Sequence, residues 1–523
     1  MENSIGKRVF RGTLIIVLVG IAAKFTSFIL EAVLAAYLGT TYQSDAFYMV
    51  SGVQAVLYPM LSIGIWKVFL PLYKHNYACG RPEEADALSD QVISFFSIAS
   101  FLAVVLLILF AEPVVSAVAP GFAGETRALC VKLVRLSAPM YFFIISAAIY
   151  ATMLQAHNKF LGSQIREVAS HIPTIVAALF FYKKFGIEAM ALGLVAGGMV
   201  RLLVELPFVD WGYRFRPDFR FHAPEFRLLL KRMPSALISA GVGQLNKLID
   251  KAMASTLPEG TISSLNYGSK LSSVFGGLLS ASIATALYPQ TIELIALKKT
   301  DALGKLITRI ISIFCVVMVP VTLACVLFRE ELVAAAFQRG AFAAESTALT
   351  AGVFAMYCLG LFSGASNAVI SNVFYGFGDT RTPMQISLIN LVTNVLLNLV
   401  LIRFFMANGL ALATSLSSII TFFVRLVLVR RYVSLDHGGM MITALKVLAA
   451  AVAACSAPRI LFWIYPADAW LVLLLAAVIG GGLFYGILRL LRVRALDDLL
   501  GIVQKSLRDL INNFRSKRED RQS

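Results

Sequence analysis

The sequence predicts an all-α integral membrane protein with about fourteen transmembrane helices. Hydrophobic residues make up 58% of the 523 residues and charged residues only 15%, and the mean hydropathy is +0.78. A soluble domain carries roughly a quarter charged residues, so most of this chain is expected to face lipid. Apolar runs of about 20 residues recur from end to end, and each is long enough to cross a hydrocarbon layer of about 30 Å.

The predicted helices follow one another with short loops between them. They span residues 12–37, 46–72, 91–111, 128–154, 164–182, 187–207, 233–255, 264–289, 308–328, 348–376, 383–403, 409–429, 442–463 and 468–490. The first run is not expected to be a cleaved signal peptide, because Lys24 and Glu31 interrupt it where a signal peptide is uniformly apolar.

The net charge of +16 follows the predicted topology of the helices. Basic residues gather in alternate loops, such as the segment before the first helix and the run from Arg214 to Arg232, at a ratio of roughly four to one. This distribution predicts cytoplasmic N- and C-termini, and it does not indicate a nucleic-acid partner. Six cysteines show no CxxC or metal-ligand spacing, so no metal site is expected.

An internal repeat with an offset of about 220 residues is visible in two places. Lys183–Gly193 aligns with Arg403–Ala413, and Ser62–Pro71 aligns with Ser280–Pro289. Because the offset spans an even number of helices, both halves enter the membrane from the same side, as in the parallel repeats of secondary transporters.

The repeat predicts five regions. They are an N-terminal six-helix lobe (1–210), a cytoplasmic basic connector (211–232), a C-terminal six-helix lobe (233–432), an extra helix pair (440–492) and a cytoplasmic amphipathic basic tail (493–523). The tail carries apolar residues at helical spacing opposite basic ones. It is therefore expected to form either an interfacial helix on anionic lipid or a helix packed on the protein's own cytoplasmic face.

Ionisable residues inside the predicted helices are the functional candidates, because a charge in the bilayer costs several kcal/mol unless it is paired or hydrated. Lys24 and Glu31 share one stripe of the first helix, with Ser27 between them. Asp45 opens the second helix, and Asp250 and Lys270 lie in the seventh and eighth. The structural alternative for Asp250 is that it and Lys247 neutralise each other at i,i+3 spacing. The structural alternative for Lys67 and Lys251 is that their side chains extend to the membrane–water interface.

Common catalytic motifs are absent from the sequence. There is no GxxxxGK[ST], HExxH or GxSxG, and the short loops leave no room for an extramembrane catalytic domain. A transporter is therefore expected rather than an enzyme. An inactive scaffold and an integral glycosyltransferase remain alternatives, although the longest outer loops offer acidic residues without a catalytic motif.

Several motifs strongly resemble the MurJ/MviN family. They are Phe337–Phe342, Gly378–Met384 and Gly409–Ser417, supported by Tyr37–Gly39, Ser44–Phe47, Asn246–Asp250 and Leu265–Leu271. Members of this family are lipid II flippases of the multidrug/oligosaccharidyl-lipid/polysaccharide exporter superfamily. The resemblance implies a V-shaped fold of two lobes and fourteen helices, in which the last two helices form a groove for a polyprenyl tail.

The resemblance also implies roles for the charged residues. Lys24 and Lys270 stand where the family typically carries arginine, Leu30-Glu31 replaces an Arg-Asp pair, and an arginine expected near Tyr58 has no counterpart. We expect Lys24 and Lys270 to bind the substrate diphosphate. Glu31, Asp45 and Asp250 would balance charge or respond to a monovalent cation or the membrane potential, and no other cofactor is expected.

The function that the resemblance implies is translocation of lipid II, an undecaprenyl-diphosphate-linked peptidoglycan precursor, from the inner to the outer leaflet by alternating access. The expected partners are lipid II, membrane lipids and the cell-wall synthesis machinery. Two alternatives stay open, a flippase for another polyprenyl-linked glycan and, less favoured, a drug/cation antiporter of the same superfamily.

Overall fold

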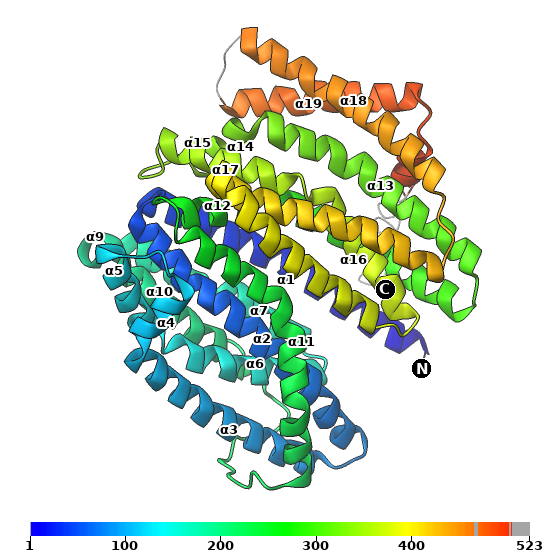
Figure 1. Cartoon of the computed structure of the whole chain (residues 1–523). Coiled ribbons are helices and arrows are strands. Elements are labelled where there is room, and N and C mark those ends of the chain that lie inside the picture. Colours follow the sequence, from blue (N-terminus) through cyan, green and yellow to red (C-terminus); the bar gives the residue numbers. More distant parts are fainter. Residues whose placement is uncertain (1, 465–468, 502–503, 505–523) are drawn as a thin grey trace, which may run out of the picture. The chain divides into compact units, whose positions relative to one another are not determined.

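The computed structural model describes residues 2–464, 469–501 and 504, and the regular elements in these ranges are all helical (Figure 1). The prediction of an all-α chain is confirmed, and each of the fourteen predicted ranges falls on helix. By length and composition, nine of the described helices could cross a membrane, or ten if one bent pair is a single span. A count of fourteen transmembrane helices is therefore not confirmed.

Contacts divide the chain into two compact units. The first unit comprises Met1–Lys270, Phe337–Thr350 and Asn398–Leu410, and the second comprises Leu271–Ala336, Ala351–Leu397 and Ala411–Ser523. This division does not follow the expected lobes 1–210 and 233–432, whose organisation stays a prediction.

The N-terminal half of the chain supplies most helices of the first unit. They are α1 (Glu2–Leu38), α2 (Tyr42–Ala78), α3 (Pro82–Leu109), α4 (Ala111–Val118), α5 (Gly124–Ser137), α6 (Met140–Ala156), α7 (Phe160–Ala169), α8 (Ile172–Val176), α9 (Tyr182–Phe185), α10 (Ile187–Leu203) and α11 (Pro224–Ala254). Helix α12 (Thr261–Ala296) begins in this unit and continues into the second.

The remaining helices belong wholly or largely to the second unit. They are α13 (Thr300–Leu327), α14 (Arg329–Phe337), α15 (Ala344–Cys358), α16 (Leu361–Gly376), α17 (Arg381–Leu428), α18 (His437–Ile464) and α19 (Ala469–Leu490). Two predicted helices, 383–403 and 409–429, both lie in α17, which is kinked at Met406 with φ 48° and ψ −125°.

Three predicted helices are divided into shorter ones, with a proline or glycine at each division. Residues 128–154 form α5 and α6, bent by 44° just before Met140, where Pro139 has no N–H to donate. Residues 164–182 divide into α7, α8 and a π-helical turn, with Pro173 at the start of α8. Residues 348–376 divide into α15 and α16 at Gly360.

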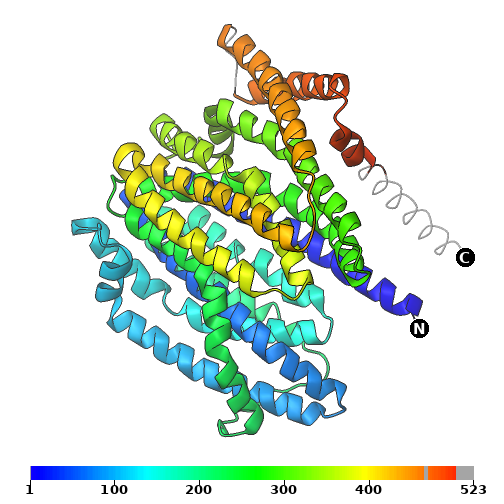
Figure 2. The same ribbon diagram turned by 45° about the vertical axis from the view of Figure 1, so that its right-hand side comes forward.

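Helices α2 and α11 run side by side through the first unit (Figures 1 and 2). Their contact is apolar, with Phe69 and Tyr73 of α2 and Phe226 of α11 almost fully buried in one cluster. Burial of a large apolar side chain stabilises the fold by about 1.5–3 kcal/mol, which accounts for the grouping of α11 with the N-terminal helices.

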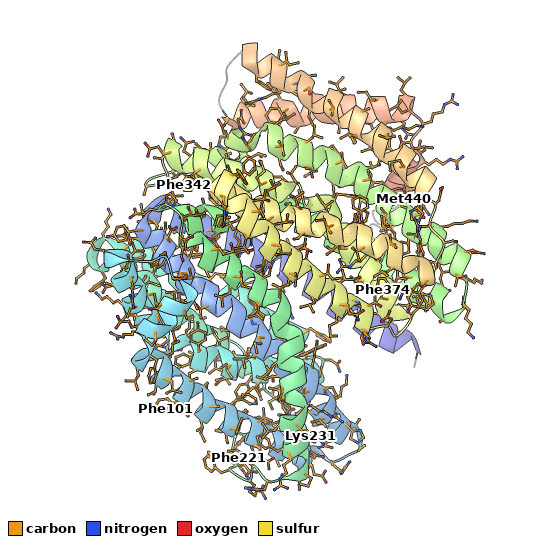
Figure 3. The ribbon with its side chains drawn as sticks, viewed as in Figure 1. Phe101, Phe221, Lys231, Phe342, Phe374 and Met440 are labelled. Carbon is orange, nitrogen blue, oxygen red and sulfur yellow. The ribbon has the colours of Figure 1, made fainter. Side chains whose placement is uncertain are left out.

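The predicted connector 211–232 is held against the N-terminal half of α3. The Tyr213 hydroxyl donates to Asp90 at 2.7 Å, and the backbone N–H of Asp218 donates to Ser94 at 3.1 Å. Phe221 packs among the neighbouring aromatic rings (Figure 3). Helix α11 begins at Pro224, so the second half of the expected connector is helical.

Two motifs that carry the family resemblance meet in the first unit. The backbone N–H of Ala341 donates to the Ala36 carbonyl at 2.8 Å. Gly39 has φ +56°, and a Cβ there would lie 2.5 Å from the Ala341 carbonyl oxygen. Only glycine fits this crossing of Tyr37–Gly39 with Phe337–Phe342, because the backbones touch and the torsion is left-handed.

The described start of the tail packs on the second unit. Val493, Leu496 and Leu499 contact an apolar cluster from α13, α18 and α19, and Arg309 pairs with Asp498 at 2.7 Å. Of the two expectations for the tail, this part favours packing on the protein itself. Its expected continuation through Leu507, Leu510 and Phe514 lies outside the described residues.

Candidate functional site

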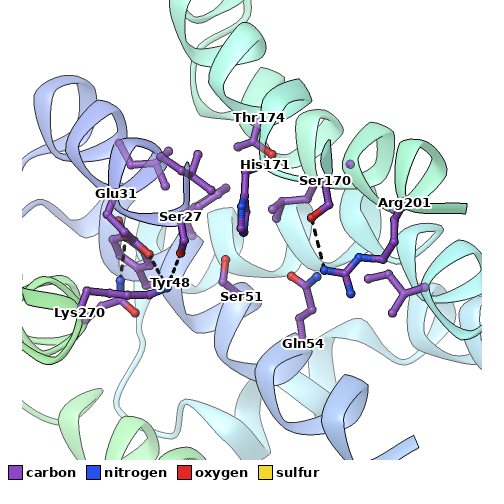
Figure 4. Close-up of a pocket in the computed structure, with 18 of the residues that line it drawn as sticks. Ser27, Glu31, Tyr48, Ser51, Gln54, Ser170, His171, Thr174, Arg201 and Lys270 are labelled. Carbon is purple, nitrogen blue, oxygen red and sulfur yellow. Dashed lines mark hydrogen bonds and ion pairs between the residues drawn. The ribbon is translucent and has the colours of Figure 1, made fainter. Parts of the chain in front are cut away.

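A polar cavity of about 220 Å³ lies within the first unit (Figure 4). Its walls come from α1, α2, α6, α8, α10, α11 and the first turns of α12. The polar lining residues are Ser27, Glu31, Tyr48, Ser51, Gln54, Ser170, His171, Thr174, Arg201, Lys251, Asn266 and Lys270. Residues far apart in the sequence thus converge on one space in the helix bundle, as expected of a transport or binding cavity.

Glu31 is the carboxylate of this cavity, and it is 6% exposed. Its Oε2 accepts hydrogen bonds from the Tyr48 hydroxyl at 2.7 Å and from the Asn266 amide at 3.1 Å. Its Oε1 lies 3.6 Å from the Lys270 ammonium. A buried carboxylate needs such a set of partners, since an uncompensated charge in a low dielectric is strongly unfavourable.

Lys270 joins α12 to α1. Its Nζ donates to the Ser27 hydroxyl at 2.8 Å in addition to its ion pair with Glu31. Ser27 and Glu31 are one turn apart, which agrees with the predicted stripe of the first helix. The Lys270 side chain remains 40% exposed, so its ammonium is accessible to an anion in the cavity.

Lys24 lies outside the lining of the polar cavity. It is exposed on α1, one turn before Ser27, and it is not among the residues that line the cavity. The structure therefore brings Lys270 and Glu31 together and leaves Lys24 outside. The role of Lys24 in binding a diphosphate stays a prediction.

Asp45 caps the N-terminus of α12 through its side chain. It is 4% exposed and accepts hydrogen bonds from the backbone N–H groups of Gly260 and Ser263, both at 2.8 Å, and from the Ser263 hydroxyl at 2.8 Å. These donors belong to the N-terminus of α12, where helical N–H groups have no partner of their own. Its contacts favour a structural role, and its expected part in coupling stays a prediction.

Asp250 also lies outside the lining of the cavity. Its Oδ1 accepts a hydrogen bond from the Asn398 amide at 2.6 Å. This hydrogen bond satisfies one oxygen of the Asp250 carboxylate within α11. Its expected role in charge balance is not tested by this contact.

Two cations of the cavity were not among the predicted site residues. Lys251, for which extension to a membrane interface was the structural alternative, lines the cavity, and its Nζ donates to the Tyr48 carbonyl at 2.6 Å. Arg201 lines the cavity from α10, where its Nη2 donates to Glu167 at 2.7 Å and to the Ser170 hydroxyl at 3.3 Å. Arg201 could have been identified by the rule applied to the other charges, since it lies within a predicted helix.

The lining carries three cations, Arg201, Lys251 and Lys270, and one carboxylate, Glu31. Their side chains offer charge-assisted hydrogen bonds, which are about twice as strong as neutral ones. The cavity is therefore suited to an anionic polar group.

A second cavity, of about 380 Å³, lies within the second unit and is apolar. Helices α13, α18 and α19 line it, with Phe275, Phe328, Leu473 and Phe484 among the residues. Gly480 and Gly481 face it from α19, where the absence of side chains leaves space. The expected tail groove involved the last two helices, both of which contribute to this cavity.

The chain is similar to known proteins in sequence. The profile of the family described as lipid II flippase MurJ matches residues 34–479. A probable lipid II flippase MurJ of Buchnera aphidicola is 25% identical over 443 residues, covering 83% of this chain and 86% of the relative. The Rhizobium meliloti protein of the same description is 27% identical and covers 75% of each chain.

Solved structures share the fold. A lipid II flippase MurJ in an inward closed conformation aligns with a TM-score of 0.80 at 21% identity, covering 92% of this chain and 100% of that one. An inward-facing multidrug resistance MATE family transporter of the MOP superfamily aligns with a TM-score of 0.64 at 14% identity, covering 78% and 94%.

Proposed function

Because the chain belongs to the lipid II flippase MurJ family, we propose that it translocates lipid II from the inner to the outer leaflet of the bacterial cytoplasmic membrane. The observation that carries the proposal is the polar cavity of the first unit, in which three cations and one buried carboxylate surround a space accessible to an anionic group. No enzymatic step is needed, since the substrate leaves chemically unchanged.

Lys270 binds the diphosphate in this proposal. Its ammonium is shared between Ser27 and Glu31, with the longer contact, 3.6 Å, to the carboxylate. A diphosphate is a stronger partner than the Ser27 hydroxyl and competes with Glu31, because it carries more than one negative charge spread over several oxygens. Lys24, exposed one turn away on α1, would meet the diphosphate on its way in or out.

Glu31 then becomes the group that responds to the substrate. When Lys270 turns to the diphosphate, the carboxylate keeps Tyr48 and Asn266 but loses its cation. A compensating positive charge would favour the loaded state, and a proton, a monovalent cation or the membrane potential can supply it. Asp45 and Asp250 are less suited to this step, because both are engaged away from the cavity lining.

The apolar cavity of the second unit is proposed to hold part of the polyprenyl tail. Its lining by Phe275, Phe328 and Phe484 suits an isoprenoid chain, since burying apolar surface contributes about 25 cal/mol per Å². The headgroup and the tail would thus have separate sites on one chain. Transport by alternating access, cytoplasmic termini and contacts with the cell-wall synthesis machinery belong to the same proposal.

The test is complementation. The chain is expressed in bacteria whose own lipid II flippase can be switched off, and lipid II on the outer leaflet is measured together with growth. Rescue of both is expected. Membrane expression without rescue, together with restored export of another polyprenyl-linked glycan in a matching mutant, would replace lipid II with that glycan as the substrate.

A further inference from the structure

We propose that Arg201 forms a second anion subsite of the polar cavity, which binds a carboxylate of the peptide carried by lipid II. The inference rests on the proposed function and adds a determinant of substrate choice. Figure 4 shows Arg201 and Lys270 on opposite sides of the cavity, with Ser51 and Gln54 between them. A headgroup with two anionic ends would match two cationic sides.

Two hydrogen bonds fix the position of the Arg201 guanidinium. The side chain is only 10% exposed, and its Nη2 is held by Glu167 at 2.7 Å and by Ser170 at 3.3 Å. Both partners come from α7 or the residue that follows it. Ordering the guanidinium before a ligand arrives lowers the entropy lost on binding, so this arginine is a pre-organised recognition group.

Helix α10 packs directly on the segment that holds Arg201. Gly197 lies one turn before Arg201 and also lines the cavity, and a Cβ there would come within 2.5 Å of the Ser170 carbonyl oxygen. The absence of a side chain at position 197 therefore lets Ser170 lie close to α10, where its hydroxyl accepts a hydrogen bond from Arg201 at 3.3 Å.

Arg201 belongs to a cluster of four charged side chains. Glu167 is also approached by Arg166, whose Nε lies 3.4 Å from its Oε1, and Nη1 of Arg166 lies 3.2 Å from Oε1 of the buried Glu205. The cluster thus holds two arginines and two carboxylates, and of these four residues Arg201 is the one that lines the cavity. This position makes Arg201 the member of the cluster that a ligand in the cavity can reach.

The assignment of a carboxylate to Arg201 follows by elimination from the proposed role of Lys270. A guanidinium offers a planar fork that matches a carboxylate or a phosphate with two parallel hydrogen bonds, whereas an ammonium is a point charge. Since the diphosphate is assigned to Lys270, the anion left on the headgroup is the peptide carboxylate. A neutral polyprenyl-linked glycan has no such group, so Arg201 would favour lipid II over it.

The experiment compares two substrates in the same proteoliposomes. One is lipid II, and the other is lipid II with its peptide carboxylates converted to amides. The wild-type protein is expected to transport lipid II faster, and Arg201→Gln is expected to reduce this preference by about tenfold, chiefly through slower transport of the carboxylated substrate. Because the preference is a ratio of two rates, it does not change with the amount of folded protein.

A structural role for Arg201 predicts a different result, and Glu167→Gln is the matched control. If Arg201 only paired with Glu167, the double variant Glu167→Gln/Arg201→Gln would recover the wild-type preference and rate. Recovery in the double variant, or an unchanged preference in Arg201→Gln, would overturn the subsite. A wild-type protein that transports neither substrate would overturn the proposed function itself and the subsite with it.

Discussion

The contacts of Asp45 predict that its loss destabilises the fold. Substitution by alanine removes the acceptor of three hydrogen bonds, two of them from the backbone N–H groups of Gly260 and Ser263 at the N-terminus of α12. All three bonds are buried, so water cannot take over. If Asp45 were a coupling charge instead, its substitution would stop transport and leave stability unchanged.

The expected loss in the free energy of unfolding follows from the backbone N–H groups that the substitution leaves without a partner. Each buried N–H without a partner costs about 1–3 kcal/mol, so Asp45→Ala should lower the free energy of unfolding by about 2–6 kcal/mol. The Ser263 hydroxyl adds little, because it also donates to the Gly260 carbonyl at 3.1 Å. Asp45→Asn keeps one oxygen acceptor but turns an amide donor toward another donor, so an intermediate loss of about 1–3 kcal/mol is expected.

The assay is unfolding in mixed detergent micelles, followed by tryptophan fluorescence, with Glu259→Gln as the control. Glu259 is exposed and lies next to the same helix end, so its substitution should cost less than about 1 kcal/mol. An Asp45→Ala protein within about 1 kcal/mol of wild type would refute the structural role. Loss of transport at full stability in Asp45→Asn would support coupling.

Three further predictions concern transport, topology and a backbone crossing. Lys270→Ala should lower lipid II transport by at least about tenfold when the rate is normalised to the amount of folded protein, whereas Lys270→Arg should be tolerated; full transport in the alanine variant would exclude a diphosphate role. Cys79, which is exposed, should react with an impermeant thiol reagent only after cells are permeabilised, and labelling in intact cells would invert the topology. Gly39→Val should destabilise the protein by at least about 2 kcal/mol, because φ is +56° and a Cβ would lie 2.5 Å from the Ala341 oxygen. The control is Gly20→Ala, where a Cβ would meet nothing within 4 Å, and equal unfolding of the two variants would argue against the crossing.

The positions of the helices could be predicted because hydropathy and length determine them. Every predicted range falls on helix, since a chain in lipid must satisfy its backbone hydrogen bonds internally. The breaks were harder to predict, although Pro139, Pro173 and Gly360 are visible in the sequence. Proline and glycine also occur inside unbroken transmembrane helices, such as Pro320 within α13, so their presence alone does not locate a bend.

The charged residues show where sequence reasoning stops. Glu31 and Asp45 both satisfied the rule that a carboxylate in the membrane marks a functional site, yet one lines the cavity and the other caps α12. The difference depends on which neighbour the fold supplies. Glu31 meets a lysine that is 40% exposed, whereas Asp45 meets the N-terminus of another helix.

Arg201 is a cavity residue that the sequence prediction omitted. It lies within the predicted helix 187–207, so the rule for charges in the membrane applies to it, but an arginine near the end of a helix can also extend to the membrane surface. Its importance comes from residues of another helix segment, because Glu167 and Ser170 turn it toward a space that also receives Lys270. The convergence of one arginine and two lysines on a common cavity is a property of the packed bundle. Such a site can carry substrate preference even though Arg201 and Lys251, unlike Lys270, lie outside the motifs that carry the family resemblance.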